Sequence, residues 1–340
     1  MTDTVNNVLL QFGLRRKSVW NPPTLLDHLF SSPLTCLTSH AHQMLLRLRG
    51  APAVLRTPDS VDHLRHSASP TITVVCISDT HERTVSVPSG DLLIHAGDMA
   101  SSGSRAAIQA QLDWLRAQPH RYKVVVCGNH DSFFDPEARL EADCADDAQT
   151  LDLTGVIYLQ REAVTLEFDG SRKLVVFGAP DLPYLGGENN AFQYHPQDAP
   201  WAGLVPPETD ILVTHTPPKS HLDLGLGCPS LLREVWRTRP RLHVFGHVHW
   251  GAGREAVFYD AAQSSYEALM AMPPRGLFWD LVPNRSWLLM VQTLLHGING
   301  VLFRWLMLGS AGCPGSLMVN AAQMYGSTGR MDNKPQVVYL

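Results

Sequence analysis

Short apolar stretches of strand length recur from Thr71 onward, and each ends in glycine or polar residues. They are TITVVCISD, DLLIHAGD, YKVVVCGN, KLVVFGAPD, DILVTHTPP and LHVFGHVH. Their hydrophobicity is continuous rather than alternating, which is typical of strands with both faces buried. Some of them are separated by helical patterns, SRAAIQAQLDWLRAQ and PSLLREVWRTR. Buried strands that alternate with helices predict an α/β fold.

Residues 1–70 lack this pattern and are rich in proline, serine and isolated charges. We expect one short helix there, at HQMLLRLRG over residues 42–50, and predict that the segment is a partly ordered extension. Residues 71–340 are predicted to form one large domain, with its last strands in SLMVNAAQMY and PQVVYL. A chain of 340 residues is long enough to bury a sizeable core.

A long apolar segment, WLLMVQTLLHGINGVLFRWLMLG, occupies residues 287–309 within a predicted hydrophobic insertion at about residues 276–316. Its interruptions are Gln292, His296, Asn299 and Arg304. The first three share one side of a helix, so the pattern predicts an amphipathic helix that stays on one side of any membrane. Three interpretations remain open: a packing or lid segment, a helix in a membrane interface, and a transmembrane span.

The formal net charge of -5 gives no basic excess, so duplex nucleic acid is not an expected partner. A phosphoester substrate is compatible with this charge, because bound cations supply a local positive field. The N-terminus lacks the basic start and apolar core of a signal peptide, and the six cysteines show no CxxC spacing. We therefore expect a reduced, cytoplasmic protein, with peripheral membrane contact through 287–309 as an alternative.

The polar residues at the strand ends form the candidate site. They are Asp79, His81, Asp98, Asn129, His130, His215, His247 and His249. Parallel strands end on the same side of a sheet, and ligands of open α/β folds bind beyond those ends. A mixed set of carboxylates, an amide and imidazoles suits Zn, Mn or Fe, and it exceeds what one tetrahedral ion needs. The sequence predicts two divalent ions that share Asp98 as a bridge.

Each of these pieces alone also has a structural interpretation. Asp-x-His or Gly-Asp at a strand end is commonly a turn, and a lone His215 in an apolar strand is commonly a buried hydrogen-bonding histidine. Two other histidine pairs, at 40–42 and 63–66, have metal-like spacing but no strand and no acidic partner. We assign those pairs no site, and we expect His95, in the middle of its strand, to point into the interior.

The ordered set Asp-x-His, Gly-Asp, Gly-Asn-His-Asp, His and Gly-His-x-His resembles the calcineurin-like metallophosphoesterases, from about Thr71 to His249 and again at VNAAQ. Within that superfamily, GAPDLPY, TDILVTHTPP and RPRLHVFGHVH are similar to the metallophosphoesterase-domain branch, which is related to the class III cyclic nucleotide phosphodiesterases. The resemblance implies a four-layer α/β/β/α sandwich with a dimetal site at the strand ends.

The resemblance also implies a role for each motif residue. The ligands of the first ion would be Asp79, His81, His249 and Asp98. The ligands of the second ion would be Asn129, His215, His247 and again Asp98. His130 would be the acid that faces the leaving group, and Asp131 would orient it. The ions would be Mn, Fe, Zn or Mg, with Mn expected to serve in vitro.

Two departures from the family pattern bear on the substrate. Relatives that act on phosphoproteins carry GDxVDRG and GNHE, whereas this chain has GDMASSG and GNHD, so the arginine that would grip a phosphate is absent. The insertion at 276–316 is a candidate flap over the site. We therefore predict a phosphodiesterase or phosphatase that uses metal-activated hydroxide on a small, cyclic nucleotide-like phosphoester. The alternative is a metal-loaded scaffold that binds nucleotide or phosphate with little turnover.

Overall fold

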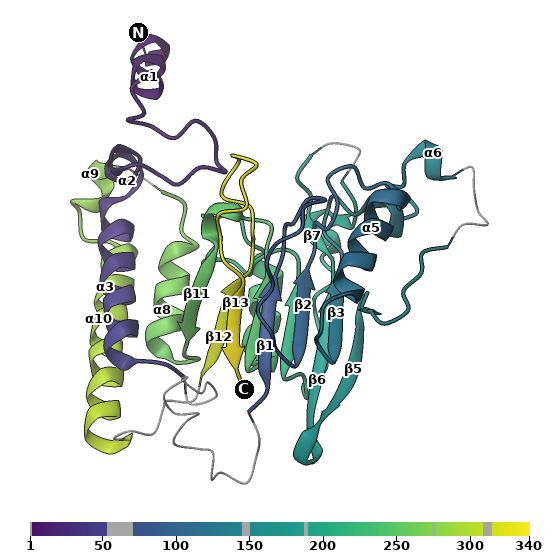
Figure 1. Cartoon of the computed structure of the whole chain (residues 1–340). Coiled ribbons are helices and arrows are strands. Elements are labelled where there is room, and N and C mark those ends of the chain that lie inside the picture. Colours follow the sequence, from purple (N-terminus) through teal and green to yellow (C-terminus); the bar gives the residue numbers. More distant parts are fainter. Residues whose placement is uncertain (1, 53–70, 145–149, 187–189, 275, 309–314) are drawn as a thin grey trace.

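The computed structural model describes residues 2–52, 71–144, 150–186, 190–274, 276–308 and 315–340 (Figure 1). Its centre is a pair of β-sheets. The first sheet contains, in spatial order, β13 (Gln336–Tyr339), β1 (Thr73–Ile77), β2 (Leu92–Ala96), β3 (Tyr122–Val126) and β4 (Ile157–Tyr158). The second contains β11 (Gly253–Val257), β12 (Ser316–Asn320), β10 (Leu242–Phe245), β9 (Ile211–Thr214), β6 (Arg172–Ala179) and β5 (Glu162–Phe168).

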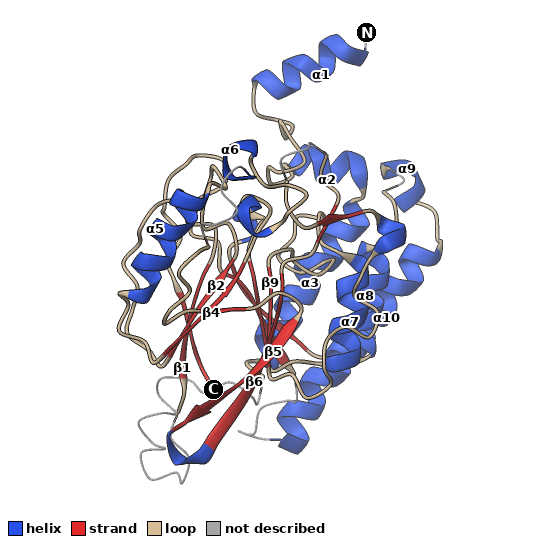
Figure 2. Ribbon diagram, turned by 90° about the vertical axis from the view of Figure 1, so that its right-hand side faces the viewer, coloured by secondary structure: helices blue, strands red, loops and turns tan. Residues whose placement is uncertain are grey.

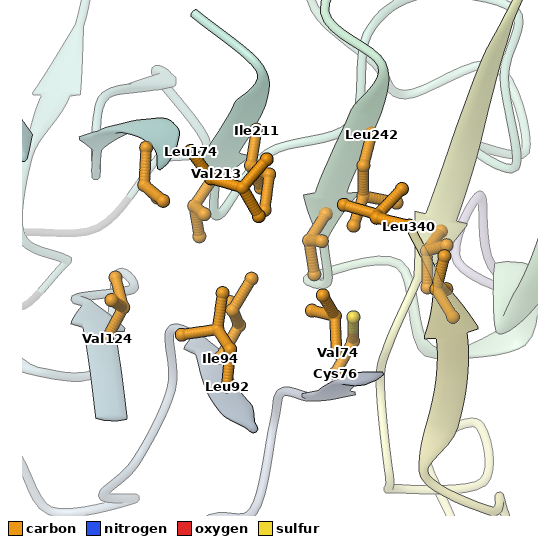
Figure 3. Close-up of a cluster of buried hydrophobic side chains, with 14 of the residues drawn as sticks. Val74, Cys76, Leu92, Ile94, Val124, Leu174, Ile211, Val213, Leu242 and Leu340 are labelled. Atoms are coloured by element: carbon orange, nitrogen blue, oxygen red, sulfur yellow. The ribbon is translucent and has the colours of Figure 1, made fainter. Parts of the chain in front are cut away.

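The two sheets face each other across one apolar core. Val74 of β1 and Ile94 of β2 point toward the second sheet, where Leu242 of β10 and Val213 of β9 point back toward the first (Figure 3). All four side chains are fully buried. Burying one such aliphatic side chain stabilises the fold by about 1.5–3 kcal/mol.

Helices cover the outer face of each sheet. Ile108 of α5 (Arg105–Arg116) packs against the first sheet, and Val235 of α7 (Pro229–Thr238) packs against the second. Figure 2 shows these two helices on opposite sides of the strands. Because alternate residues of β1 and β2 point to the two faces, both faces must be apolar, which explains their continuous hydrophobicity. The predicted four-layer α/β/β/α arrangement is confirmed.

Every apolar stretch of strand length singled out in the sequence forms a strand, and the two helical patterns between those stretches form α5 and α7. The sequence did not reveal β5, an edge strand that pairs antiparallel with β6. Its residues alternate between exposed and buried near the end, with Leu166 and Phe168 facing the core, so no continuous apolar stretch marks it. The remaining short elements are α6 (Glu141–Cys144), β7 (Leu182–Pro183) and β8 (Gln193–Tyr194).

A further group of helices lies along one flank of the sandwich (Figure 1). It consists of α2 (Leu25–Ser31), α3 (Pro33–Arg49), α8 (Ala261–Met270), α9 (Leu277–Asp280), α10 (Arg285–Phe303) and the π-helical turn η5 (Arg304–Leu308). Helix α1 (Thr2–Gln11) projects away from the body of the protein. The helix expected at 42–50 is the end of the longer α3, and α1 and α2 were not expected. Ser32 donates a hydrogen bond to Asp280 over 2.7 Å, which joins α3 to α9.

The buried imidazole of His221 attaches α8 to the second sheet. Its Nε2 lies 3.0 Å from Glu267 Oε1 in α8, and its Nδ1 lies 3.4 Å from Glu255 Oε2 in β11. Burial alone would lower the pKa of His221, but the two carboxylates outweigh burial and raise the pKa to about 10. The charged imidazole is therefore stabilised in the folded protein.

We expect this ion cluster to make the free energy of unfolding depend on pH. The folded-state pKa of His221 lies above its ordinary value of about 6.5, so the stabilisation is full below that pH and is lost as pH rises through about 10. Thermal unfolding of the protein and of His221→Gln, measured from pH 6 to 10, checks this. The difference in Tm between the unchanged protein and His221→Gln should become smaller with rising pH. A difference that does not vary with pH would contradict the assignment.

Candidate metal centre

The predicted ligands lie just beyond the carboxyl ends of parallel strands. Asp79 follows β1, Asp98 follows β2, Asn129 follows β3, His215 follows β9 and His247 follows β10. Ligand atoms within 4.8 Å of one another form three groups: Asp79, His81 and His249; His81, Asp98 and His130; and Asp98, His215 and His247. Both sheets thus contribute to one compact cluster, in which Asp98 belongs to two groups.

The outer ring nitrogens of two histidines are held by backbone carbonyls. Nδ1 of His215 lies 2.9 Å from the carbonyl oxygen of Ala96, and Nδ1 of His249 lies 2.8 Å from that of Gly326. A carbonyl only accepts hydrogen bonds, so both Nδ1 atoms must carry protons. In the neutral imidazoles this leaves the Nε2 lone pairs free toward the cluster, which is the arrangement common to metal-binding histidines.

Those Nε2 atoms face other acceptors. His215 Nε2 lies 3.3 Å from Asp98 Oδ2 and 3.2 Å from Asn129 Oδ1, while His249 Nε2 lies 3.1 Å from Asp79 Oδ1. Lone pairs at these distances repel one another unless a proton or a cation lies between them. The donor set of oxygens and imidazole nitrogens fits divalent Mn, Fe or Zn.

The electrostatics of the cluster also favour positive charge. Burial alone would lower the pKa of His215 and of His249, but the negative charges of Asp98 and Asp79 outweigh it and raise each pKa to about 9. Burial would raise the pKa of both aspartates, yet the neighbouring histidines hold these pKa values below the usual range. The same negative charges of Asp79 and Asp98 would attract divalent cations bound among these groups.

The backbone at the ligands adopts a conformation that side chains usually avoid. The φ angles are 53° at Asp79, 45° at His81, 55° at Asp98 and 67° at His247, all in the left-handed region. Each such residue costs about 1–2 kcal/mol relative to ordinary backbone. Strain of this kind persists where the surrounding structure holds it, and it clusters at functional sites.

Two glycines that precede ligands are required by close approach. A Cβ atom at Gly128 would lie 2.2 Å from Asp98 Oδ1, and one at Gly246 would lie 2.2 Å from Asp79 Oδ2. Any side chain at these positions would displace a carboxylate of the cluster. The Gly-Asn and Gly-His pairs of the sequence therefore reflect packing against the site as well as turn formation.

His130 is exposed beside the cluster. Its backbone N–H donates to Asp98 Oδ1 over 2.9 Å, and its Nδ1 lies 3.3 Å from the carbonyl oxygen of Ser101. Its ring meets that of His81 edge to face at 5.2 Å between centroids. The ring is thus anchored at Nδ1, and its Nε2 is the atom left for a bound molecule.

Asp131 does not hold the ring of His130 as expected. Its carboxylate is fully buried and accepts hydrogen bonds from the backbone N–H groups of Gly128 at 2.8 Å and Ala100 at 3.0 Å. Burial and the charge of Asp98 raise the pKa of Asp131 to about 7. Asp131 is therefore buried and joins two site loops, while the exposed imidazole of His130 is anchored by Ser101.

Two further residues reach the site without a signal in the sequence. Asn190 Oδ1 accepts a hydrogen bond from Nδ2 of Asn129 over 2.9 Å, which turns Oδ1 of Asn129 toward His215. Trp20, from the N-terminal extension, meets His247 edge to face at 5.2 Å between ring centroids. Neither residue belongs to a motif, and only the folded chain brings them here.

Other residues singled out in the sequence lie elsewhere. His95 Nε2 lies 2.9 Å from Thr80 Oγ1 inside the first sheet, as expected. The histidine pair at 40–42 lies in α3, away from the cluster, and the pair at 63–66 falls outside the described residues.

A cavity of about 390 Å³ opens onto the cluster. Its wall includes the ligand residues Asp98, Asn129, His247 and His249, together with His130, Asn190, Trp20 and Trp250. No described residue of 276–308 lines it, so this part of the insertion does not form the expected flap there. The segment that reaches over this site is the N-terminal extension.

A sequence model of the calcineurin-like phosphoesterase family matches residues 72–251, a span that contains every predicted ligand. The chain belongs to this family. The match leaves out Trp20 and the helices of the flank.

Three relatives place the chain more narrowly. It is 41% identical over 259 residues to the probable rhamnogalacturonate lyase C of Emericella nidulans, covering 75% of this chain and 23% of that protein. It is 40% identical over 215 residues to the UPF0046 protein K07C11.7 of Caenorhabditis elegans, covering 57% of this chain and 71% of that protein. It is 37% identical over 205 residues to the human metallophosphoesterase domain-containing protein 1, covering 53% of this chain and 61% of that protein. The first and third alignments span less than two thirds of the relative's own length.

Proposed function

We propose that this chain hydrolyses a small phosphodiester of the cyclic-nucleotide kind with the help of two divalent cations. The observation that carries the proposal is a single cavity in which ligand residues, the exposed imidazole of His130 and two indole rings converge. Family membership supports a metal-dependent phosphoesterase in general, and the cavity wall supports the narrower substrate class.

We infer two neighbouring cation positions from the donor set. The first position would use Asp79, His81, His249 and Asp98. The second would use Asn129, His215, His247 and Asp98. Divalent cations held there would lower the pKa of a water molecule and offset the negative charge of a phosphoryl group. We infer Mn²⁺ as the ion for assays, because borderline metals suit mixed nitrogen and oxygen ligands.

His130 is placed to protonate the leaving group. Asp98 fixes its backbone and Ser101 anchors its Nδ1, so the charged imidazole can present Nε2–H to the cavity. Transfer of that proton to the departing oxygen would prevent the release of a strongly basic alkoxide. Asp131 supports this geometry indirectly, by joining the loops that carry Ala100 and Gly128.

The aromatic part of the cavity wall favours a flat organic group. Trp20 and Trp250 both line the cavity, and stacking of a nucleobase on an aromatic ring contributes about 1–3 kcal/mol. No Lys or Arg is among the described residues of this wall, so nothing there would follow an extended phosphate backbone. These features support a small cyclic nucleotide over duplex nucleic acid.

A panel of phosphoesters assayed with Mn²⁺ tests the substrate class. We expect turnover of cyclic nucleotides and its loss in chelator. Trp20→Ala should raise KM for a cyclic nucleotide by about 5–100-fold through lost stacking, while KM for an alkyl diester without a ring stays unchanged. Trp20→Phe should keep most of the affinity. Trp279→Ala removes an exposed indole of α9 outside the cavity and serves as the control.

Two results would contradict the proposal. Equal rises of KM for both substrates in Trp20→Ala would mean that the indole merely shapes the extension. Tight nucleotide binding without turnover anywhere in the panel would favour the alternative of a metal-loaded binding scaffold.

A further inference from the structure

The outward face of α10 and η5 is apolar and exposed. Its residues are Leu288, Val291, Leu295, Ile298, Leu302, Trp305 and Leu306. Leu295 is 63% exposed and Leu306 is 78% exposed. Among the described residues, the stretch Arg285–Met307 is the one helix long and apolar enough to cross a membrane, although 28% of its most apolar window is buried.

The opposite face of α10 is fixed to the protein. Leu289, Met290, Thr293 and Gly297 are buried, and a Cβ atom at Gly297 would lie 2.6 Å from a methyl carbon of Leu45 in α3. The expected amphipathic pattern is therefore incomplete, because Gln292, His296 and Asn299 form only a narrow polar strip beside two apolar faces. Crossing a membrane would strip α10 from α3 and α8, whereas lying on a membrane would not.

The apolar surface continues past both ends of α10. Phe278 and Trp279 of α9 are 82% and 58% exposed and lie just before it in the chain. At the far end, Trp305 Nε1 donates to the carbonyl oxygen of Leu48, an exposed residue of α3, over 3.4 Å. Figure 1 shows α3 and α10 running together along the flank, with α8 between them and the sheets.

The charge of α3 and of residues 281–308 differs in sign from that of the whole chain. The protein has a formal net charge of -5, yet α3 and residues 281–308 contain no aspartate or glutamate. Their cations are Arg47, Arg49, Arg285 and Arg304. Arg49 pairs with Asp260, Arg47 is exposed but lines a cavity together with Glu255 of β11, and Arg285 is exposed at the start of α10. A positive, tryptophan-bearing apolar surface complements an anionic lipid layer, since tryptophan favours the membrane interface and arginine favours anionic headgroups.

We propose that the outward face of α10, together with α9, docks onto the headgroup region of an anionic bilayer, with the helix lying along the membrane. Apolar side chains enter the boundary of the acyl chains while the exposed arginines meet the headgroups. Anionic lipids are enriched in the cytoplasmic leaflet, which fits a peripheral protein on that side. This surface is separate from the metal cluster, so the proposal stands independently of the proposed function.

The test is flotation of the full chain with vesicles of phosphatidylcholine alone or with about 30% phosphatidylserine. We expect binding that requires phosphatidylserine, weakens in high salt and is released by alkaline carbonate. Leu295→Glu combined with Leu302→Glu should reduce binding at least about tenfold. The matched control is Gln292→Glu combined with His296→Glu, which adds the same charge to the polar strip of the same helix and should retain most of the binding.

Thermal unfolding and metal content of all variants establish that they are folded. Absence of flotation with either vesicle, or equal binding by the two double variants, would overturn the proposal. Resistance of the membrane-bound protein to alkaline carbonate would show a spanning helix instead. A dimer in solution that the Leu295 and Leu302 changes dissociate would identify a second copy of the chain as the occupant of this face.

Discussion

Replacing Asp98 with alanine is expected to remove both bound cations and to lower kcat/KM by more than about 100-fold. Asp98 Oδ2 lies 3.3 Å from His215 Nε2 and 3.8 Å from His81 Nε2, which places its carboxylate between the two ligand groups. Loss of a group that merely supports a ligand costs about 10–100-fold in metal affinity or activity, so loss of the shared ligand should exceed that. Metal content per chain and kcat/KM with added Mn²⁺ measure the effect.

Two companion variants make the Asp98 experiment specific. Asp79→Ala removes a carboxylate that belongs to one ligand group, so it should lose one cation and keep the other. Asp181→Asn changes a buried carboxylate that pairs with Arg161 away from the cluster, and it should keep both. A wild-type content of one ion per chain, or full activity in Asp98→Ala, would refute the shared-ligand arrangement.

Replacing His130 with alanine is expected to lower kcat by about 10²–10⁴-fold on an alkyl or cyclic nucleotide diester, the usual range for general acid catalysis. The effect on a nitrophenyl ester should be less than about tenfold, because nitrophenolate leaves without a proton. The exposed ring, anchored at Nδ1 by Ser101, is the basis for this expectation. The measurement is kcat on both substrates, with metal content determined in the same preparations.

The paired substrates separate three roles for His130. A proton donor affects the alkyl substrate selectively and leaves both cations bound. A structural residue depresses both reactions alike. Loss of a cation would make His130 a ligand, which the geometry allows because its ring nitrogen falls in one group with His81 and Asp98. Either of the last two outcomes removes it from the acid role.

Much of the candidate site was predictable because the carboxyl ends of parallel strands lie at the same edge of a sheet. Asp79, Asp98 and Asn129 each follow a continuous apolar stretch, and parallel neighbouring strands bring such ends to one edge. His215 and His247 follow strands of the second sheet in the same way. Residue type then limits the chemistry, because carboxylates, an amide and imidazoles together suit divalent metals.

The role of Asp131 could not be predicted because it depends on backbone geometry. A motif places Asp131 next to His130 in the chain, but the carboxylate of Asp131 accepts hydrogen bonds from Gly128 and Ala100, whereas the ring of His130 contacts Ser101. Similarly, nothing local distinguishes Asn190 from its neighbours in the loop. Asn190 contributes to the site by accepting a hydrogen bond from Asn129, which is 61 positions away in the chain.

The sequence by itself determined the layers of the sandwich and the set of candidate ligand residues, because buried strands need continuous apolar stretches and metal chemistry needs particular side chains. Only the tertiary structure decided that Trp20 reaches the site, that no described residue of the insertion lines it, and that α10 keeps a second apolar face toward solvent. Those outcomes depend on how segments far apart in the chain pack together. A local hydrophobic pattern shows that one face of a helix or strand must be buried, but it does not show which distant segment packs against that face.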